Sequence, residues 1–236
     1  MKIAIISDVH GNSIALDQCF EYLEKNCFID QTYFLGDSVG YFPDSNRVID
    51  KLIEKDCICL LGNHDAMMIG ELDLDNKKDE VYRISKFCNS VSKENKVYIG
   101  SLNSFREESI ANKKVLFVHG SPDNSLEGYV YPDSDFSKIM DNPYDIIFMG
   151  HTHYPFIKEN NDKVFVNVGS VGLSRDTGNW QSFAIFDTNL MSIELVRLKL
   201  NSKAILDSYQ DRVHVSVKKV LNRNNLKNKE GDEIFL

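Results

Sequence analysis

The sequence lacks long apolar runs and an excess of positive charge. Before Ser7 the apolar run spans only Ile3–Ile6, so we predict neither a signal peptide nor a membrane span. The formal net charge of −8 disfavours a broad electrostatic grip on nucleic acid, and no basic stripe with interleaved aromatic residues suggests such binding. An anionic substrate would therefore have to be held by local positive charge.

Cysteine is scarce and shows no pairing pattern. The five cysteines are odd in number and include no Cys-x-x-Cys motif, so we expect them to be reduced and buried in a cytoplasmic protein. Internal repeats and linker-like composition are also missing. We therefore expect one domain over residues 1–221, followed by a polar C-terminal tail over residues 222–236.

Strand-like and helix-like segments alternate at the start of the chain. Short apolar runs rich in β-branched residues predict strands, and apolar residues at helical spacing predict the helices between them. The predicted strands are Lys2–Ile6, Gln31–Leu35 and Cys57–Leu61, and the predicted helices are Ser13–Asn26 and a second one opening at Pro43 and Asp44. Three strand–loop–helix units in a row predict a largely parallel sheet.

The later part of the chain mixes strands with polar connections. We expect one helix through Val81 and Val91, a polar connection over residues 103–112, and a loop over residues 123–135 that overhangs the site. The further predicted strands are Val115–Val118, Ile146–Met149, Val164–Asn167, Ser182–Asp187 and Ser192–Leu198. A helical stripe from Ile205 to Val220 either packs on the body or makes a homodimer contact, and the sequence leaves both open.

Metal-binding side chains follow the predicted strands. They are Asp8, His10, Asp37, Asn63, His64, His119, His151 and His153. The carboxyl ends of parallel strands meet at one edge of a sheet, where ligands bind. His214 falls in the late helical stripe, and we expect it to be an ordinary surface or packing residue. A single buried histidine is usually just hydrogen-bonded, but five at strand ends favour a metal site. Imidazole and carboxylate together suit Mn, Fe, Zn, Ni or Co.

The number of candidate ligands indicates two metal ions. With His64 set aside, seven ligands are too many for one ion that keeps a position for water. If one aspartate bridges, each ion has about four protein ligands and room for water. Two aspartates and two divalent ions give the site a net positive charge, which is the local charge that a phosphate requires.

The motifs resemble the five-block signature of the calcineurin-like metallophosphoesterases. The blocks are Asp8-x-His10, Gly36-Asp37, Gly62-Asn63-His64-Asp65, His119-Gly120 and Gly150-His151-x-His153. The segment from Asn167 to Asp176 is similar to a stretch of the small prokaryotic phosphoesterases of that superfamily. The resemblance implies an α/β fold, a four-layer α/β/β/α sandwich with two mixed sheets, and a metal-dependent hydrolase of small or nucleotide-like phosphomonoesters or phosphodiesters.

The resemblance also implies a role for each residue. Asp8, His10, Asp37 and His153 would hold the first metal, and Asp37, Asn63, His119 and His151 the second. Mn²⁺ is the first expectation for the metal, with Fe, Ni, Co or Zn as alternatives. His64 would be the general acid, with Asp65 orienting it or, alternatively, capping a helix. Asn12 and Arg175 are the candidate substrate-binding residues, although Arg175 could instead form a structural ion pair.

Two other functions occur on the same fold and are alternatives to hydrolysis of small phosphoesters. Protein Ser/Thr phosphatases of the superfamily carry an arginine after Gly-Asp, where this chain has Ser38-Val39-Gly40-Tyr41, so that activity is disfavoured. A catalytically silent scaffold of the same fold would be expected to lose motif residues, and this chain has lost none.

Overall fold

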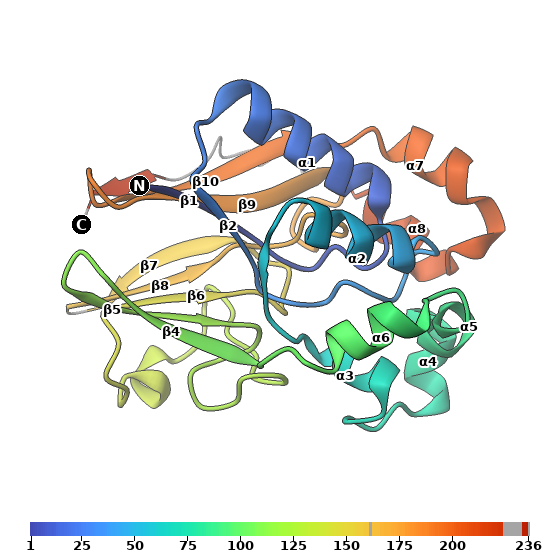
Figure 1. The fold of residues 1–236 in the computed structure, drawn as a ribbon, viewed down its shortest axis with the longest axis horizontal. Helices are drawn as coiled ribbons and strands as arrows, with labels where there is room; N and C mark the ends of the chain where they lie inside the picture. The colour runs from blue at the N-terminus through green and yellow to red at the C-terminus, as the bar shows by residue number, and fades with distance from the viewer. Residues whose placement is uncertain (161, 224–232, 236) are drawn as a thin grey trace.

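Two mixed sheets lie face to face (Figure 1), and the computed structural model describes residues 1–160, 162–223 and 233–235. The first sheet has the order β11-β10-β9-β1-β2-β3, with β1 (Lys2–Ile6) inside it. Its other strands are β2 (Gln31–Phe34), β3 (Ile58–Cys59), β9 (Trp180–Asp187), β10 (Ser192–Lys199) and β11 (Glu233–Phe235). β1 pairs parallel with β2 and antiparallel with β9, so this sheet is mixed.

The second sheet is also mixed, which confirms the predicted fold class. Its order is β4-β5-β6-β8-β7. The strands are β4 (Phe105–Ile110), β5 (Lys113–Val118), β6 (Ile146–Met149), β7 (Phe156–Asn160) and β8 (Lys163–Asn167). β5, β6 and β8 run parallel, and β4 and β7 add antiparallel edges.

The alternation of side chains along β1 explains why the strand is apolar throughout. Ile3 and Ile5 pack between the two sheets against residues such as Phe117, while Ala4 and Ile6 pack against the helices on the other face. A strand buried on both faces has no position for a polar side chain. β1 is therefore fixed between two hydrophobic layers, and the loop that follows it is held firmly.

The outer layers of the sandwich differ in kind. The helices α1 (Ser13–Asn26), α2 (Ser45–Glu54), α7 (Ser202–Tyr209) and α8 (Val215–Leu221) pack on the outer face of the first sheet (Figure 1). On the outer face of the second sheet, Val130 and Phe136 from a long loop with a short 3₁₀ helix, η1 (Phe136–Ile139), pack on Leu116 and Ile147. The fourth layer is therefore mainly a loop, not α-helices.

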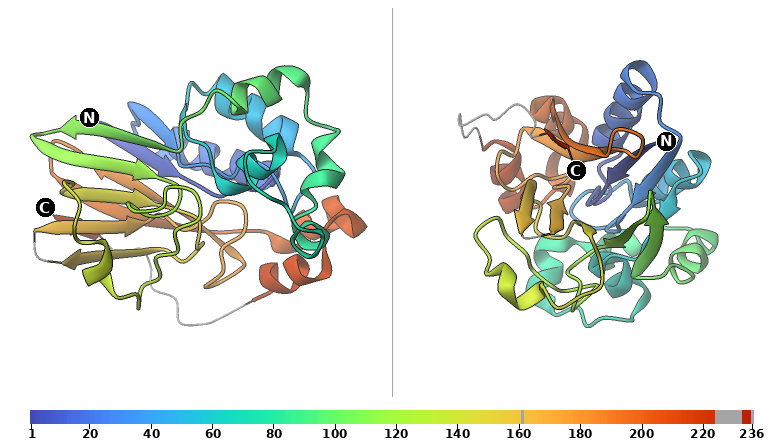
Figure 2. Two further views of the ribbon diagram at one scale, coloured as in Figure 1. Left: turned by 90° about the horizontal axis from the view of Figure 1, so that it is seen from below. Right: turned by 90° about the vertical axis from the view of Figure 1, so that its left-hand side faces the viewer.

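Four short helices follow β3. They are α3 (Asn63–Ile69), α4 (Asn76–Tyr82), α5 (Ile84–Cys88) and α6 (Lys93–Ile99), gathered at one end of the molecule (Figure 2). The prediction of one helix through Val81 and Val91 is wrong, because Arg83 has a φ of 58° and ends α4 in the left-handed region. The predicted polar connection over 103–112 is also wrong, since it contains the largely exposed edge strand β4.

The late apolar stripe packs on the body of the protein. Ile205, Tyr209, Val217 and Leu221 are buried in the core cluster beside the first sheet, with a 3₁₀ turn, η2 (Gln210–Arg212), between α7 and α8. His214 caps the start of α8. Residues 224–232 of the predicted tail lie outside the described residues, and β11 pairs with β10. Within the described ranges, no helix has both the length and the apolar character that a bilayer span requires.

Candidate metal centre

Loops from both sheets deliver the predicted ligands to one place. Asp8 and His10 follow β1, Asp37 follows β2, and Asn63 opens α3; His119 follows β5, and His151 and His153 follow β6. All seven side chains are at most 5% exposed. A buried group of this kind is costly unless each polar atom finds a partner or a cation.

Five of these seven residues adopt a backbone conformation that non-glycine residues rarely use. The φ angles are 56° at Asp8, 54° at His10, 64° at Asp37, 64° at His151 and 61° at His153. Such strained positions persist only where the surrounding structure holds them, and they cluster at functional sites. The sheets therefore stabilise the loops in a conformation that turns these side chains toward one point.

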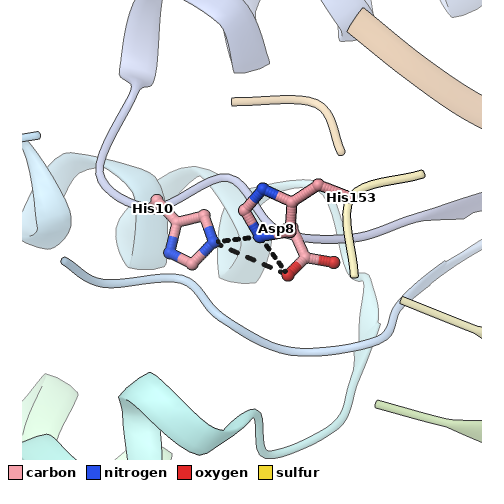
Figure 3. A group of neighbouring side chains, drawn as sticks. All are labelled: Asp8, His10 and His153. Atoms are coloured by element: carbon pink, nitrogen blue, oxygen red, sulfur yellow. Dashed lines mark hydrogen bonds and ion pairs between the residues drawn. The ribbon is translucent and has the colours of Figure 1, made fainter. Parts of the chain in front are cut away.

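The first group consists of Asp8, His10 and His153 (Figure 3). Nε2 of His10 lies 2.9 Å from Nε2 of His153, and the latter lies 3.1 Å from Oδ1 of Asp8. On the far side of each ring, Nδ1 faces a backbone carbonyl: that of Val39 for His10 at 3.1 Å and that of Leu173 for His153 at 2.6 Å. A carbonyl can only accept, so each Nδ1 carries the proton.

The second group consists of Asp37, His119 and His151. Nδ1 of His119 faces the carbonyl of Leu35 at 3.1 Å, which again places the proton on Nδ1. Its Nε2 lies 2.9 Å from Oδ1 of Asn63 and 3.5 Å from Oδ2 of Asp37. Asn63 thus brings a neutral oxygen to the same place as the two imidazoles.

Asp37 lies between the two groups. Its Oδ2 is 3.7 Å from Nε2 of His10 in the first group and 3.5 Å from Nε2 of His119 in the second. Its Oδ1 accepts a hydrogen bond from the backbone N–H of His64 at 2.8 Å. The close approach requires glycine at position 62, because a Cβ there would stand 2.2 Å from Oδ1 of Asp37.

The donor set fits divalent transition-metal ions. With the protons of His10 and His153 on Nδ1, two Nε2 lone pairs face each other at 2.9 Å, which is a repulsive contact without a cation. Oδ1 of Asp8 and Nε2 of His151 are buried and have no hydrogen-bond partner among the described residues. Imidazole rings whose Nδ1–H is fixed by a carbonyl are the usual form of a metal-ligating histidine.

Burial favours the neutral form of His119, His151 and His153, the form that binds a metal. Burial, then the charge of His119, lowers the pKa of His151 to about 2, and burial, then the charge of Arg175, lowers that of His153 to about 4. Burial also lowers the pKa of His119. For Asp37, burial and then the charges of Asp8 and Asp65 raise the pKa well above its ordinary value. Cations at this position would favour the ionised carboxylates.

Comparison with known proteins identifies the family. A family model for the calcineurin-like phosphoesterase superfamily domain matches residues 1–191. The chain belongs to the calcineurin-like phosphoesterase superfamily. It is therefore a phosphoric ester hydrolase of a family that implies divalent metal ions.

Three relatives of this phosphoesterase cover most of its length. An uncharacterized protein of Methanocaldococcus jannaschii is 33% identical over 219 residues, which are 85% of this chain and 88% of that protein. The crystal structure of a metallophosphoesterase from Sphaerobacter thermophilus has a TM-score of 0.79 at 25% identity, covering 94% of this chain and 98% of that one. That of a hypothetical protein from Pyrococcus horikoshii OT3 has a TM-score of 0.78 at 22% identity, with 94% and 98% covered.

His64 of the phosphoesterase lies beside the first group and is 3% exposed. Its ring centroid is 4.6 Å from that of His10 and 4.2 Å from that of Tyr82, and its Nδ1 has no hydrogen-bond partner among the described residues. Burial, then the charge of His10, lowers its pKa well below the ordinary value. Its Nδ1 or Nε2 can also be grouped with His10 and Asp37 as a ligand set.

The contacts of Asp65 correspond to the helix-cap alternative. Its Oδ2 accepts hydrogen bonds from the N–H of Asp37 at 2.8 Å and of Gly62 at 3.1 Å. Its Oδ1 accepts from the N–H and the hydroxyl of Ser38, at 3.0 and 2.6 Å. The expected contact with His64 is not among these bonds, because backbone donors at the start of α3 and after β2 already use both oxygens. Asp65 thus locks the loop of Asp37 onto α3.

Asn12 and Arg175 differ in their access to the site. Asn12 is 0% exposed, its oxygen caps α1 at the N–H of Ala15, and its nitrogen donates to the carbonyl of Gly172 at 2.9 Å. Its amide thus makes structural hydrogen bonds at both ends, and substrate binding by Asn12 stays a prediction. Arg175 is half-buried and donates from Nη2 to the hydroxyl of Tyr41, and its charge acts on the pKa values of both His151 and His153.

Two tyrosines border the metal centre. Tyr41 contacts His10 at 4.6 Å between ring centroids, and Tyr129 contacts His151 at 4.1 Å. Tyr41 stands in the segment where the protein phosphatases carry arginine, and Tyr129 stands in the loop predicted to overhang the site.

Proposed function

We propose that the protein hydrolyses small phosphate esters with two divalent metal ions that share Asp37. The observation that carries this proposal is the position of Oδ2 of Asp37, within 3.7 Å of a histidine Nε2 on each side. Asp8, His10, Asp37 and His153 would hold the first ion, and Asp37, Asn63, His119 and His151 the second. When bound, the ions supply Lewis acidity toward the phosphate and a nucleophilic hydroxide at neutral pH.

The residues around the ions have separate tasks in this proposal. Arg175 binds a phosphate oxygen as a fixed cation, which an acidic protein needs at this place. His64 donates a proton to the leaving oxygen. Although burial depresses its pKa, the negative charge of a bound phosphate raises that pKa again, so the imidazole takes up its proton once the substrate is present. Asp65 holds the bridging loop in place through its hydrogen bonds to the backbone of Asp37 and Ser38.

We further propose Mn²⁺ as the working metal, from the mixture of carboxylate, amide and imidazole ligands. We propose a cytoplasmic location, which the five free cysteines support. A homodimer stays a prediction that sedimentation of the purified protein tests. It would need a surface other than the late helical stripe, since that stripe is buried in the core.

The test is metal content together with hydrolysis. We expect about two metal equivalents per chain after reloading a chelator-treated sample, and hydrolysis of 4-nitrophenyl phosphate, bis(4-nitrophenyl) phosphate or both in a panel of Mn²⁺, Ni²⁺, Co²⁺, Zn²⁺ and Mg²⁺. His119→Ala should lose metal and activity, whereas His214→Ala, a histidine that caps α8, should keep both. A protein that binds no metal and hydrolyses neither ester with any ion would overturn the proposal.

A further inference from the structure

Three tyrosines form a row that begins at the metal centre. The ring centroid of Tyr129 is 4.1 Å from that of His151, that of Tyr131 is 6.1 Å from Tyr129, and that of Tyr154 is 5.7 Å from Tyr131. The planes of Tyr129 and Tyr131 are within 9° of each other. Tyr129 and Tyr131 come from the loop after β5, and Tyr154 follows the ligand His153. We call these three residues the tyrosine row.

The tyrosine row is not part of the hydrophobic core. Tyr129 is 54% exposed, and Tyr131 and Tyr154 are half-buried. The next residue along the chain, Val130, points inward and packs with Phe136 on the second sheet. Val130 therefore holds the loop against the core, while the rings of Tyr129 and Tyr131 on either side of it lie outside the core.

The surroundings of the row indicate which ligand it suits. Aromatic side chains stack with other planar rings, and each stacked base adds to affinity whatever its identity. The loop that carries the row also holds Asp123, Glu127, Asp133 and Asp135. These carboxylates repel a polyanion but not a neutral ring. A single nucleotide ester therefore fits this surface better than a nucleic-acid strand does.

We propose that the tyrosine row stacks on a nucleobase carried by the substrate and makes the enzyme selective for nucleoside phosphate esters. This inference rests on the proposed function, because it places the phosphate at the metal centre beside His151. The first ring of the row is then adjacent to the phosphate, and the substituent of the ester extends over Tyr129 toward Tyr131. Stacking acts on binding and not on bond cleavage, so it raises kcat/KM for esters that carry a base.

The test compares two esters with the same leaving group. Thymidine 5′-(4-nitrophenyl phosphate) carries a base, methyl 4-nitrophenyl phosphate carries none, and both release 4-nitrophenolate. In the wild type with Mn²⁺ we expect kcat/KM to be higher for the thymidine ester. Tyr129→Ala should reduce this preference about 10-fold, the effect of one stacked base, whereas Tyr129→Phe, which keeps the ring, should retain it.

Two further variants complete the design. Tyr131→Ala should also lower the preference, and it provides an independent readout should Tyr129→Ala fold poorly. Tyr22→Ala serves as the matched control, because Tyr22 lies on α1 against Phe183 and away from the metal centre. If the wild type and both alanine variants hydrolyse the two esters with the same preference, the proposed role of the tyrosine row is wrong, and the proposed function stands. If the wild type hydrolyses 4-nitrophenyl phosphate but neither of these two esters, the role of the tyrosine row is overturned and the proposed function stands. If it hydrolyses none of these esters with any of the five ions, the proposed function is overturned and the role of the row with it.

Discussion

The hydroxyl of Tyr41 accepts a hydrogen bond of 3.0 Å from Nη2 of Arg175, a residue 134 positions later in the chain. Tyr41 is 4% exposed and packs edge-on against His10, so its hydroxyl is held in place. The backbone N–H of Arg175 donates to the carbonyl of His153 at 3.1 Å, which fixes the other end of the arginine. The guanidinium is thus secured beside the metal centre by two segments.

We expect Tyr41→Phe to raise KM for phosphate esters about 10-fold, with a smaller effect on kcat, because the arginine loses its anchor while the metal ligands stay. Arg175→Ala should raise KM further. In the Arg175→Ala background, adding Tyr41→Phe should change KM no more, since Tyr41 acts through the arginine. The measurements are steady-state kinetics and metal content. Additive effects of the two substitutions would contradict this positioning role.

Asp37→Asn should remove activity and most of the metal from both positions. The amide carries no charge, and the carboxylate lies beside a histidine of each group. Elemental analysis of the purified protein checks this, with Asp207→Asn as the control because Asp207 is exposed on α7 and pairs with Lys203. Two full metal equivalents in an inactive Asp37→Asn protein would show that Asp37 does not bridge.

Asp65→Ala should lower the free energy of unfolding by about 3 kcal/mol or more, because it leaves several buried backbone donors without a partner. Asp75→Ala is the matched control: Asp75 also accepts from two backbone N–H groups at a helix start, but it is exposed. That change should cost only about 1 kcal/mol. Denaturant unfolding measures both, and equal losses would argue against the bridging role of Asp65 between α3 and the loop of Asp37.

His64→Ala should keep both metals and reduce the rate on an alkyl phosphoester about 10²–10⁴-fold, since an alkoxide leaves only with a proton. The loss should be much smaller on a nitrophenyl ester, whose leaving group is stable without protonation. Metal content and kcat with both substrates decide the role. Because Asp37, His10 and His64 could also form a ligand set, loss of one metal equivalent from this variant would make His64 a ligand.

The metal centre could be predicted from the sequence because its signal is local. Each block changes within a few residues from a buried apolar strand to a polar ligand, as from Ile6 to Asp8. The lengths of these strands then bring all ligands to one edge. The two mixed sheets followed from the family resemblance, which rests on these motifs, whereas the alternation of strands and helices alone predicted a largely parallel sheet and did not indicate the antiparallel strands β9 and β10.

Some contacts could not be predicted because they join residues far apart in the sequence. Others could not be predicted because two possible hydrogen-bond partners compete for the same side chain. Nothing near Tyr41 indicates that its hydroxyl bonds to Arg175, and nothing near Asn12 shows that its amide is used by Gly172. Asp65 has two chemically reasonable roles, and only the positions of the backbone donors decide between them. β4 was missed because an exposed edge strand needs few apolar residues, so its composition resembles that of a loop.

The position of β1 determines when the first sheet can form during synthesis. Ile5 pairs with Tyr33 on one side and with Ala184 on the other. β1 and β2 can meet early, but one edge of β1 stays open until β9 has left the ribosome. Pairings so distant along the chain form slowly, and an open strand edge invites association with other chains. In a newly made chain, the edge of β1 that later pairs with β9 is therefore open to such association.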